Sequence, residues 1–137
     1  MCGCGSLTAE VATDPVVVGA CHCTQCQRRT GSVFGVGAYF RQEDVRTAGT
    51  STSYIRDGQE GRKVRTHFCP VCGSTVFWFV DFFPGFIGVA VGAFADPSFT
   101  KPALSVWELT RHPWVVFGHS VESHIEGAGA RQSVASD

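Results

Sequence analysis

The sequence predicts a mainly β domain, built of many short strands with at most short helices. Sixteen glycines and six prolines are spread through the 137 residues, so turns are expected at short intervals. The segments between these turns are rich in Val, Thr, Phe and Trp, the residue types that favour strands. No long stretch repeats apolar residues at helical spacing, which argues against a helical fold.

Turn residues separate the expected strands. The first two strands flank the turn signal Thr13-Asp14-Pro15, and the fourth and fifth flank Asp57-Gly58. The segment from Thr24 to Thr30, which follows a cysteine cluster, is expected to form one short helix. In chain order the expected strands are Leu7–Val11, Val16–Ala20, Val33–Phe40, Thr52–Ile55, Arg62–Phe68, Thr75–Val80, Phe86–Ala93 and Leu104–Leu109.

The composition is that of one globular domain. Hydrophobic residues make up 44% of the chain and charged residues 17%, and 137 residues are enough for a buried core. We expect residues 1–126 to form this domain and the small, polar segment 127–137 to fray as a tail. A net charge of −1 gives no basic excess for a nucleic-acid partner. No apolar run reaches the roughly 18 residues of a membrane span, so we expect a cytoplasmic protein without a membrane partner.

The most informative residues are seven cysteines in three clusters, Cys2-Gly-Cys4, Cys21-His-Cys23-Thr-Gln-Cys26 and Cys69-Pro-Val-Cys72. In a reducing compartment such clusters bind metal more often than they form disulfides. Pairs two or three residues apart let thiolates converge on one small cation such as zinc. Pro70 and Gly73 suit the tight turn of a zinc knuckle. Seven ligands allow one four-thiolate site and one three-thiolate site with an open position.

Spacing alone leaves the partition of these ligands open. The first cluster needs two partners from elsewhere in the chain, and the third cluster would supply them. The alternative is a ribbon of Cys23 and Cys26 with the third cluster, although its gap of 42 residues is long. Such ribbons typically have gaps of roughly 15–20 residues. An iron–sulfur cluster is a further option, but the spacing matches neither ferredoxin pattern. A redox dithiol at the third cluster is disfavoured, because a strand rather than a helix is expected after it.

Several segments occur in an order and an internal spacing that are specific. They are Cys2-x-Cys4-Gly5, Cys21-His-Cys23-x-x-Cys26-x-Arg28 with Gly31, Phe68-Cys-Pro-x-Cys-Gly-Ser74, Ala93–Pro97, the stretch around Trp107, and His112-Pro-Trp114. Over roughly residues 2 to 115 the chain thereby resembles the glutathione-dependent formaldehyde-activating enzyme family, which includes centromere protein V. The resemblance implies a single zinc-stabilised domain of the β-tent type with two zinc ions. The implied ligands are Cys2, Cys4, Cys69 and Cys72 for a structural zinc, and Cys21, Cys23 and Cys26 for a second, catalytic-type zinc.

The resemblance also implies an activity, the reversible condensation of glutathione with formaldehyde to S-hydroxymethylglutathione. The protein would then be a carbon–sulfur lyase, with a small thiol such as glutathione as its partner. A thiol bound at the open position of the second zinc would lose its proton and become a nucleophile. Because three cysteinates already neutralise the zinc, positioning would matter more than polarisation of the carbonyl group.

Two residues are candidates for substrate contacts. Arg28, close after Cys26, can bind a carboxylate of glutathione, although a solvated surface position is the plainer interpretation. Phe34 lies near the second cysteine cluster in sequence and can line a substrate site there. His22 and His67 are expected to support metal ligands rather than to bind metal. The loop-like segment Phe82–Gly85 is a candidate pocket border or homodimer contact.

Two alternatives to an enzyme stay open. One is a non-catalytic zinc-binding module, for which no thiol substrate would perturb the second metal site. The other is a thiol redox or metal-storage domain, in which the second cluster loses zinc on oxidation. In that case mild peroxide would change the number of titratable thiols.

Overall fold

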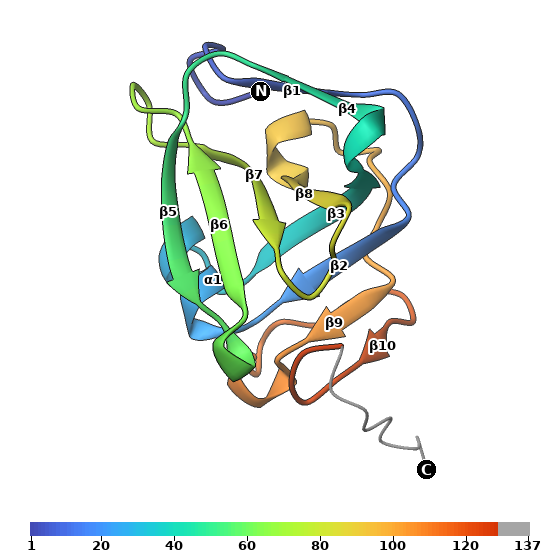
Figure 1. Ribbon diagram of the computed structural model, residues 1–137. Coiled ribbons are helices and arrows are strands. Elements are labelled where there is room, and N and C mark those ends of the chain that lie inside the picture. Colours follow the sequence, from blue (N-terminus) through green and yellow to red (C-terminus); the bar gives the residue numbers. More distant parts are fainter. Residues whose placement is uncertain (129–137) are drawn as a thin grey trace. The chain divides into compact units, whose positions relative to one another are not determined.

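The computed structural model describes residues 1–128 (Figure 1). It is mainly β, with ten strands and one α-helix among the described residues, which confirms the predicted fold class. The chain forms two compact units, one of residues 1–16 and 38–99 and the other of residues 17–37 and those from 100 onward. The single domain expected over residues 1–126 stays a prediction. Most of the expected tail, residues 129–137, lies outside the described residues.

The first unit is built from antiparallel strand pairs (Figure 1). Four strands pair in sequence order, namely β5 (Thr52–Asp57), β6 (Lys63–Phe68), β7 (Thr75–Val80) and β8 (Phe86–Ala90). Two others, β1 (Thr8–Val11) and β4 (Val45–Ala48), form a separate antiparallel pair. The register between β6 and β7 shifts between His67 and Phe68, immediately before Cys69. The regular ladder therefore ends where the third cysteine cluster begins.

The core of the first unit gathers on β7, whose sequence TVFWFV is almost continuously apolar. Trp78 and Val80 pack with Val64 of β6, and Tyr39 and Phe83 lie against this cluster. The Trp78 indole N–H donates to Tyr39 Oη at 3.1 Å, so the one polar atom of this ring is satisfied although the side chain is buried. The apolar burial of these side chains fixes β7 between its two neighbours.

The second unit contains a parallel arrangement of short strands and the helix. Strand β9 (Leu104–Val106) pairs in parallel with both β2 (Val17–Cys21) and β10 (Glu122–Ser123). Helix α1 (Thr24–Thr30) begins after Cys23, whose sulfur accepts the backbone N–H of Cys26 at 3.3 Å. It ends at Gly31, which adopts φ 71° and donates its N–H to Gln27 O at 2.8 Å. Strand β3 (Gly35–Arg41) begins in the second unit and ends in the first.

All eight expected strands are present, and the helix occupies the residues predicted for it. Two strands end three residues earlier than expected. Phe86–Ala93 ends at Ala90, and Leu104–Leu109 ends at Val106, because a 3₁₀ turn follows each strand. Trp107 at φ 59° lies in the left-handed region and breaks the extended backbone. The four 3₁₀ turns of the described chain are Gln42–Asp44, Gln59–Gly61, Val91–Phe94 and Glu108–Thr110.

Strands β4 and β10 were not predicted from the sequence. Strand β10 has two residues, and β4 is a four-residue strand that is exposed over most of its length. Neither therefore carries the run of buried apolar residues that identifies a strand from sequence. Within residues 1–128, no helix has the length and apolar character needed to cross a membrane.

Candidate metal centres

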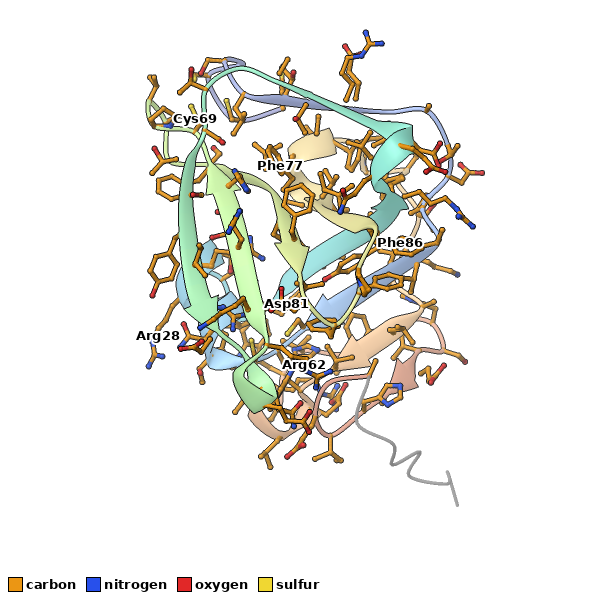
Figure 2. All side chains as sticks on the ribbon, in the orientation of Figure 1. Arg28, Arg62, Cys69, Phe77, Asp81 and Phe86 are labelled. Carbon is orange, nitrogen blue, oxygen red and sulfur yellow. The ribbon has the colours of Figure 1, made fainter. Side chains whose placement is uncertain are left out.

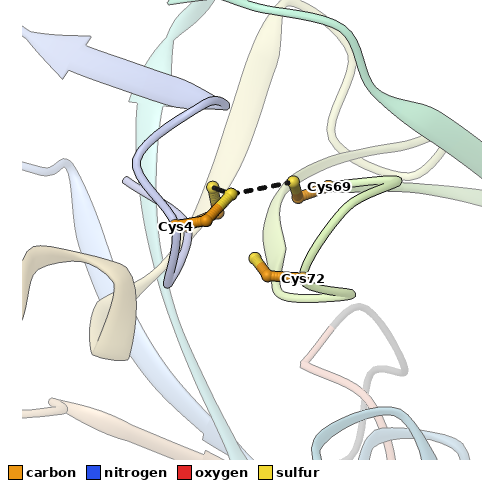
Figure 3. A group of neighbouring side chains, drawn as sticks. Cys4, Cys69 and Cys72 are labelled. Atoms are coloured by element: carbon orange, nitrogen blue, oxygen red, sulfur yellow. Dashed lines mark hydrogen bonds between the residues drawn. The ribbon is translucent and has the colours of Figure 1, made fainter.

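The sulfur atoms of the first and third cysteine clusters converge in the first unit. Those of Cys2, Cys4, Cys69 and Cys72 all lie within 4.8 Å of one another. Figure 3 shows Cys4, Cys69 and Cys72 pointing toward one common point. Cys4 Sγ is 3.7 Å from Cys2 Sγ and 3.6 Å from Cys69 Sγ. A tetrahedral zinc with Zn–S bonds of about 2.3 Å separates its sulfur ligands by about 3.8 Å, so these residues fit a zinc ion.

The two halves of this four-cysteine site share two local features. The first cysteine of each half, Cys2 or Cys69, is buried, and its sulfur accepts a backbone N–H. The donors are Leu7 at 3.2 Å and Val71 at 3.4 Å. After the second cysteine the chain turns through a glycine with positive φ, 81° at Gly5 and 77° at Gly73. Two short loops, 65 residues apart in sequence, are thereby shaped to present their sulfurs to each other.

Three of these thiols, Cys2, Cys4 and Cys72, have shifted pKa values. Hydrogen bonds from the Ser74 side chain and backbone lower the pKa of Cys72 to about 5. Burial raises the pKa of Cys2, but the Leu7 N–H and the neighbouring thiols lower it further, to about 7 overall. Ser6 lowers the pKa of Cys4, yet the Cys69 thiol, burial and Cys2 together raise it above its ordinary value. The lowered pKa values of Cys2 and Cys72 favour the deprotonated thiolate, which is the form that binds metal.

The middle cluster forms a separate three-cysteine site in the second unit. Cys21 ends β2, Cys23 precedes α1, and Cys26 lies in the first turn of α1. All three are half-buried, and their sulfur atoms lie within 4.8 Å of one another. Contacts with Cys23 and Cys26, followed by burial, raise the pKa of Cys21 well above its ordinary value. Three thiolates this close repel one another, and a bound cation removes that penalty, so the donor set fits a soft divalent metal such as zinc.

The peptide between Cys21 and Cys23 is held in place by side chains of the second unit. Gln27 Nε2 donates to His22 O at 2.9 Å and to Thr110 O at 3.2 Å. Thr110 Oγ1 donates to the same His22 O at 2.8 Å. His112 Nε2 lies 3.2 Å from Gln27 Oε1 and donates to it. This network fixes the carbonyl between two ligands, and therefore the direction in which both cysteines point.

His22 lies outside the group of converging sulfur atoms. Its ring is fully buried, 5.6 Å from the ring of Phe34 and 6.0 Å from that of Phe117. His22 Nε2 is 3.0 Å from Ser105 Oγ, and that hydroxyl donates to Glu108 Oε1. Because Ser105 gives its only proton to Glu108, His22 must carry its proton on Nε2. Burial lowers the pKa of His22, which agrees with a neutral ring that supports the loop.

The two residues predicted to contact substrate lie in different surroundings. Arg28 is exposed on the last turn of α1 (Figure 2). Phe34 packs on His22 and lies 6.4 Å from the Phe117 ring. Arg29 is the arginine that lies near the cysteines. Its Nη2 is 2.8 Å from the position that a Cβ would take on Gly35, and Cys26 Cβ is 3.7 Å from the same point. Substrate contacts by Arg28 and Phe34 stay predictions.

Several residues of the sites were not predicted from the sequence. Ser6 and Ser74 contact sulfur atoms of the four-cysteine site, and Gln27 holds the loop of the three-cysteine site. The repeated tripeptide Cys-Gly-Ser at 4–6 and 72–74 is a signal that could have identified both serines. Because Cys26 and Arg29 are three residues apart, they lie on the same side of α1. Arg28 lies on a different side of this helix. His67 Nδ1 is 3.0 Å from Ser51 Oγ, a hydrogen bond to a serine and not to a cysteine ligand, so support of a metal ligand by His67 stays a prediction.

Comparisons with known proteins give a family and a similar solved structure. No curated protein matches the sequence. Among solved structures, the chain resembles the crystal structure of a Rhodobacter sphaeroides protein determined as a structural genomics target. The TM-score is 0.51 at 27% identity, over 67% of this chain and 83% of that one. The sequence model of a family described as glutathione-dependent formaldehyde-activating enzyme matches residues 1–110, a range that includes all seven cysteines. The chain belongs to the glutathione-dependent formaldehyde-activating enzyme family.

Proposed function

We propose that the protein is a zinc-dependent carbon–sulfur lyase that acts on a thiol–aldehyde adduct such as S-hydroxymethylglutathione. The observation that carries this proposal is the three-cysteine site in the second unit. Its three half-buried sulfurs provide one ligand fewer than a closed structural zinc site requires. A fourth position is then available to a substrate thiol. The four-cysteine site, with its full ligand set, is assigned a structural zinc.

In this proposal each site has its own task. A zinc ion bound by Cys21, Cys23 and Cys26 would supply a positive charge beside which a substrate thiol ionises at neutral pH. Gln27 and Thr110 hold the His22 carbonyl, so the cysteine loop does not need to reorganise during the reaction. The Arg29 guanidinium adds positive charge near Cys26, where a carboxylate of an anionic thiol can pair with it.

The proposed reaction balances without an oxidant or a reductant. In the condensing direction the thiol sulfur bonds to the carbonyl carbon, and the carbonyl π electrons move to oxygen. The proton lost from the thiol ends on that oxygen and gives the hydroxymethyl group. The lyase direction reverses these steps and returns thiol and aldehyde. We also propose a small thiol such as glutathione as partner and a cytoplasmic location, where cysteines stay reduced.

The first experiment counts zinc per chain by elemental mass spectrometry, for protein purified without chelator. We expect two zinc ions in the wild type and one in Cys23→Ser. Cys72→Ser is the matched variant that affects the other site. Exchange spectroscopy of glutathione and formaldehyde then measures interconversion with S-hydroxymethylglutathione. We expect the catalysed exchange to be lost in Cys23→Ser while its circular dichroism spectrum is retained. Wild-type exchange by a folded Cys23→Ser protein would contradict the enzyme proposal.

A further inference from the structure

The tripeptide Cys-Gly-Ser occurs at residues 4–6 and again at residues 72–74, once in each half of the four-cysteine site. In both copies the glycine has positive φ, which turns the chain back on itself. Each serine hydroxyl therefore returns to the sulfur two residues earlier. Ser6 Oγ is 3.0 Å from Cys4 Sγ, and Ser74 Oγ is 3.3 Å from Cys72 Sγ.

Each serine also reaches across to the opposite half of the site. Ser6 Oγ lies 3.2 Å from Cys69 Sγ, and it is 4.0 Å from Cys2 Sγ. Ser74 Oγ accepts the backbone N–H of Gly3, which lies between the two cysteines of the first cluster, at 3.2 Å. The two hydroxyl groups thus connect the halves reciprocally, one through a sulfur and the other through a backbone amide.

The chemistry of the site fixes the direction of these hydrogen bonds. Four thiolates around one divalent cation leave two negative charges uncompensated, and a thiolate has no proton to donate. Each serine must therefore donate its O–H to sulfur. The backbone N–H groups of Leu7 and Val71 serve the buried sulfurs of Cys2 and Cys69. The exposed sulfur of Cys4 lies within reach of the Ser6 hydroxyl. As a thiol, Cys72 donates to Ser74 Oγ, and as a metal-bound thiolate it must instead accept from the Ser74 hydroxyl, so every thiolate then has a donor.

We propose that Ser6 and Ser74 are positioning residues that donate hydrogen bonds to the thiolates of the four-cysteine site and slow release of its metal. This proposal rests on the metal occupancy in the proposed function, but not on the proposed reaction. Ser6 has the larger effect because it contacts sulfurs of both halves, one of them the buried Cys69. Water can replace part of the Ser74 contact, because Cys72 is exposed.

The first test measures the rate of zinc transfer to a chromophoric chelator. Loss of groups that support metal ligands typically weakens metal binding about 10- to 100-fold. We expect zinc release about tenfold faster in Ser6→Ala, and a smaller acceleration in Ser74→Ala. Ser6→Thr keeps the hydroxyl and should restore the wild-type rate. Ser98→Ala is the matched control, because the Ser98 hydroxyl bonds Asp96 in the same unit and should leave the rate unchanged.

The second test separates a lost hydrogen bond from a damaged fold. Cobalt replaces zinc in a Cys23→Ser background, so that the sulfur-to-cobalt charge-transfer bands report on the four-cysteine site. Removing a donor makes the thiolate more electron-rich, so Ser6→Ala should shift these bands to longer wavelength. A collapsed site would instead lose the bands.

If Ser6→Ala binds metal, releases it at the wild-type rate and shows unshifted bands, the role of the serine is overturned. The premise that the site binds metal would then still stand. A wild-type protein that binds no metal at Cys2, Cys4, Cys69 and Cys72 would overturn the proposal together with its premise of metal occupancy. Zinc release and the cobalt bands can be measured even if the protein has no lyase activity. Failure of the proposed reaction is therefore distinguishable from failure of this proposal.

Discussion

Trp78 of β7 lies directly against Gly88, its paired residue on β8. A Cβ atom at position 88 would be 2.2 Å from Trp78 Nε1 and 2.5 Å from Cε2. The indole occupies the space that a side chain on β8 would need, and from there its N–H reaches Tyr39. A glycine in the middle of a strand normally weakens the strand, and here it makes room for the largest side chain of the core.

Gly88→Ala should therefore destabilise the first unit. The added methyl group must displace a buried indole, and overpacking of this kind costs about 1–3 kcal/mol. Denaturant unfolding followed by tryptophan fluorescence measures the loss. Gly92→Ala is the matched control, since a Cβ at Gly92 meets no atom within 4 Å. Equal stability of the two variants would show that Trp78 does not depend on the glycine.

Removal of metal from the four-cysteine site should lower the stability of the first unit sharply. The site joins loops that are 65 residues apart in sequence, so its loss frees a long segment of chain. We expect Cys69→Ser to lose about 4 kcal/mol or more, a size typical of a lost metal site. Cys23→Ser, which affects the other site, should retain the transition of the first unit. Calorimetry with and without chelator measures the unfolding transition of both variants and of the wild type. A wild-type transition that does not change on addition of chelator would contradict a structural metal.

Gln27→Ala should weaken metal binding at the three-cysteine site without unfolding the protein. The variant removes both hydrogen bonds to the carbonyls of His22 and Thr110, and the cysteine loop gains freedom. We expect metal affinity of this site to fall about 10-fold or more. Gln25→Ala, an exposed position on the same helix, should bind metal as the wild type does. Competition titration with a chelator of known affinity compares the two, and equal affinities would refute the role of Gln27.

The sequence was sufficient where local chemistry decides the structure. The segment from Thr24 to Thr30 is a helix as predicted, since Cys23 and Gly31 cap its ends. The cysteine spacing also anticipated that the sulfur atoms would converge, and the family resemblance implied the two groups that the structure shows. The sequence was insufficient where the partner is distant in the chain. Nothing near Ser6 in sequence indicates Cys69, and nothing near Gln27 indicates Thr110, because folding alone brings these residues together.

The carboxyl group of Asp96 should titrate below its ordinary pKa of 3.8. The Ser98 hydroxyl and backbone N–H both donate to Asp96 Oδ1, at 2.7 Å and 2.9 Å, and they favour the ionised form. A carboxyl with a lowered folded-state pKa stabilises the fold above its unfolded pKa. That contribution is lost as pH falls through the folded value. Carbon-detected NMR titration measures it, and Ser98→Ala should raise the pKa. An unchanged pKa in that variant would contradict the assignment.

Arg29 rather than Arg28 should govern the use of an anionic thiol substrate. The Arg29 guanidinium lies near Cys26, whereas Arg28 is exposed on the last turn of α1. Arg29→Gln should therefore raise KM for S-hydroxymethylglutathione about 10-fold, the loss of one charge-assisted contact. Arg28→Gln is the matched control on the neighbouring residue, and its KM should change less than about twofold. Initial rates at varied substrate concentration separate the two variants. A larger effect of Arg28→Gln would instead support the substrate contact predicted from the sequence.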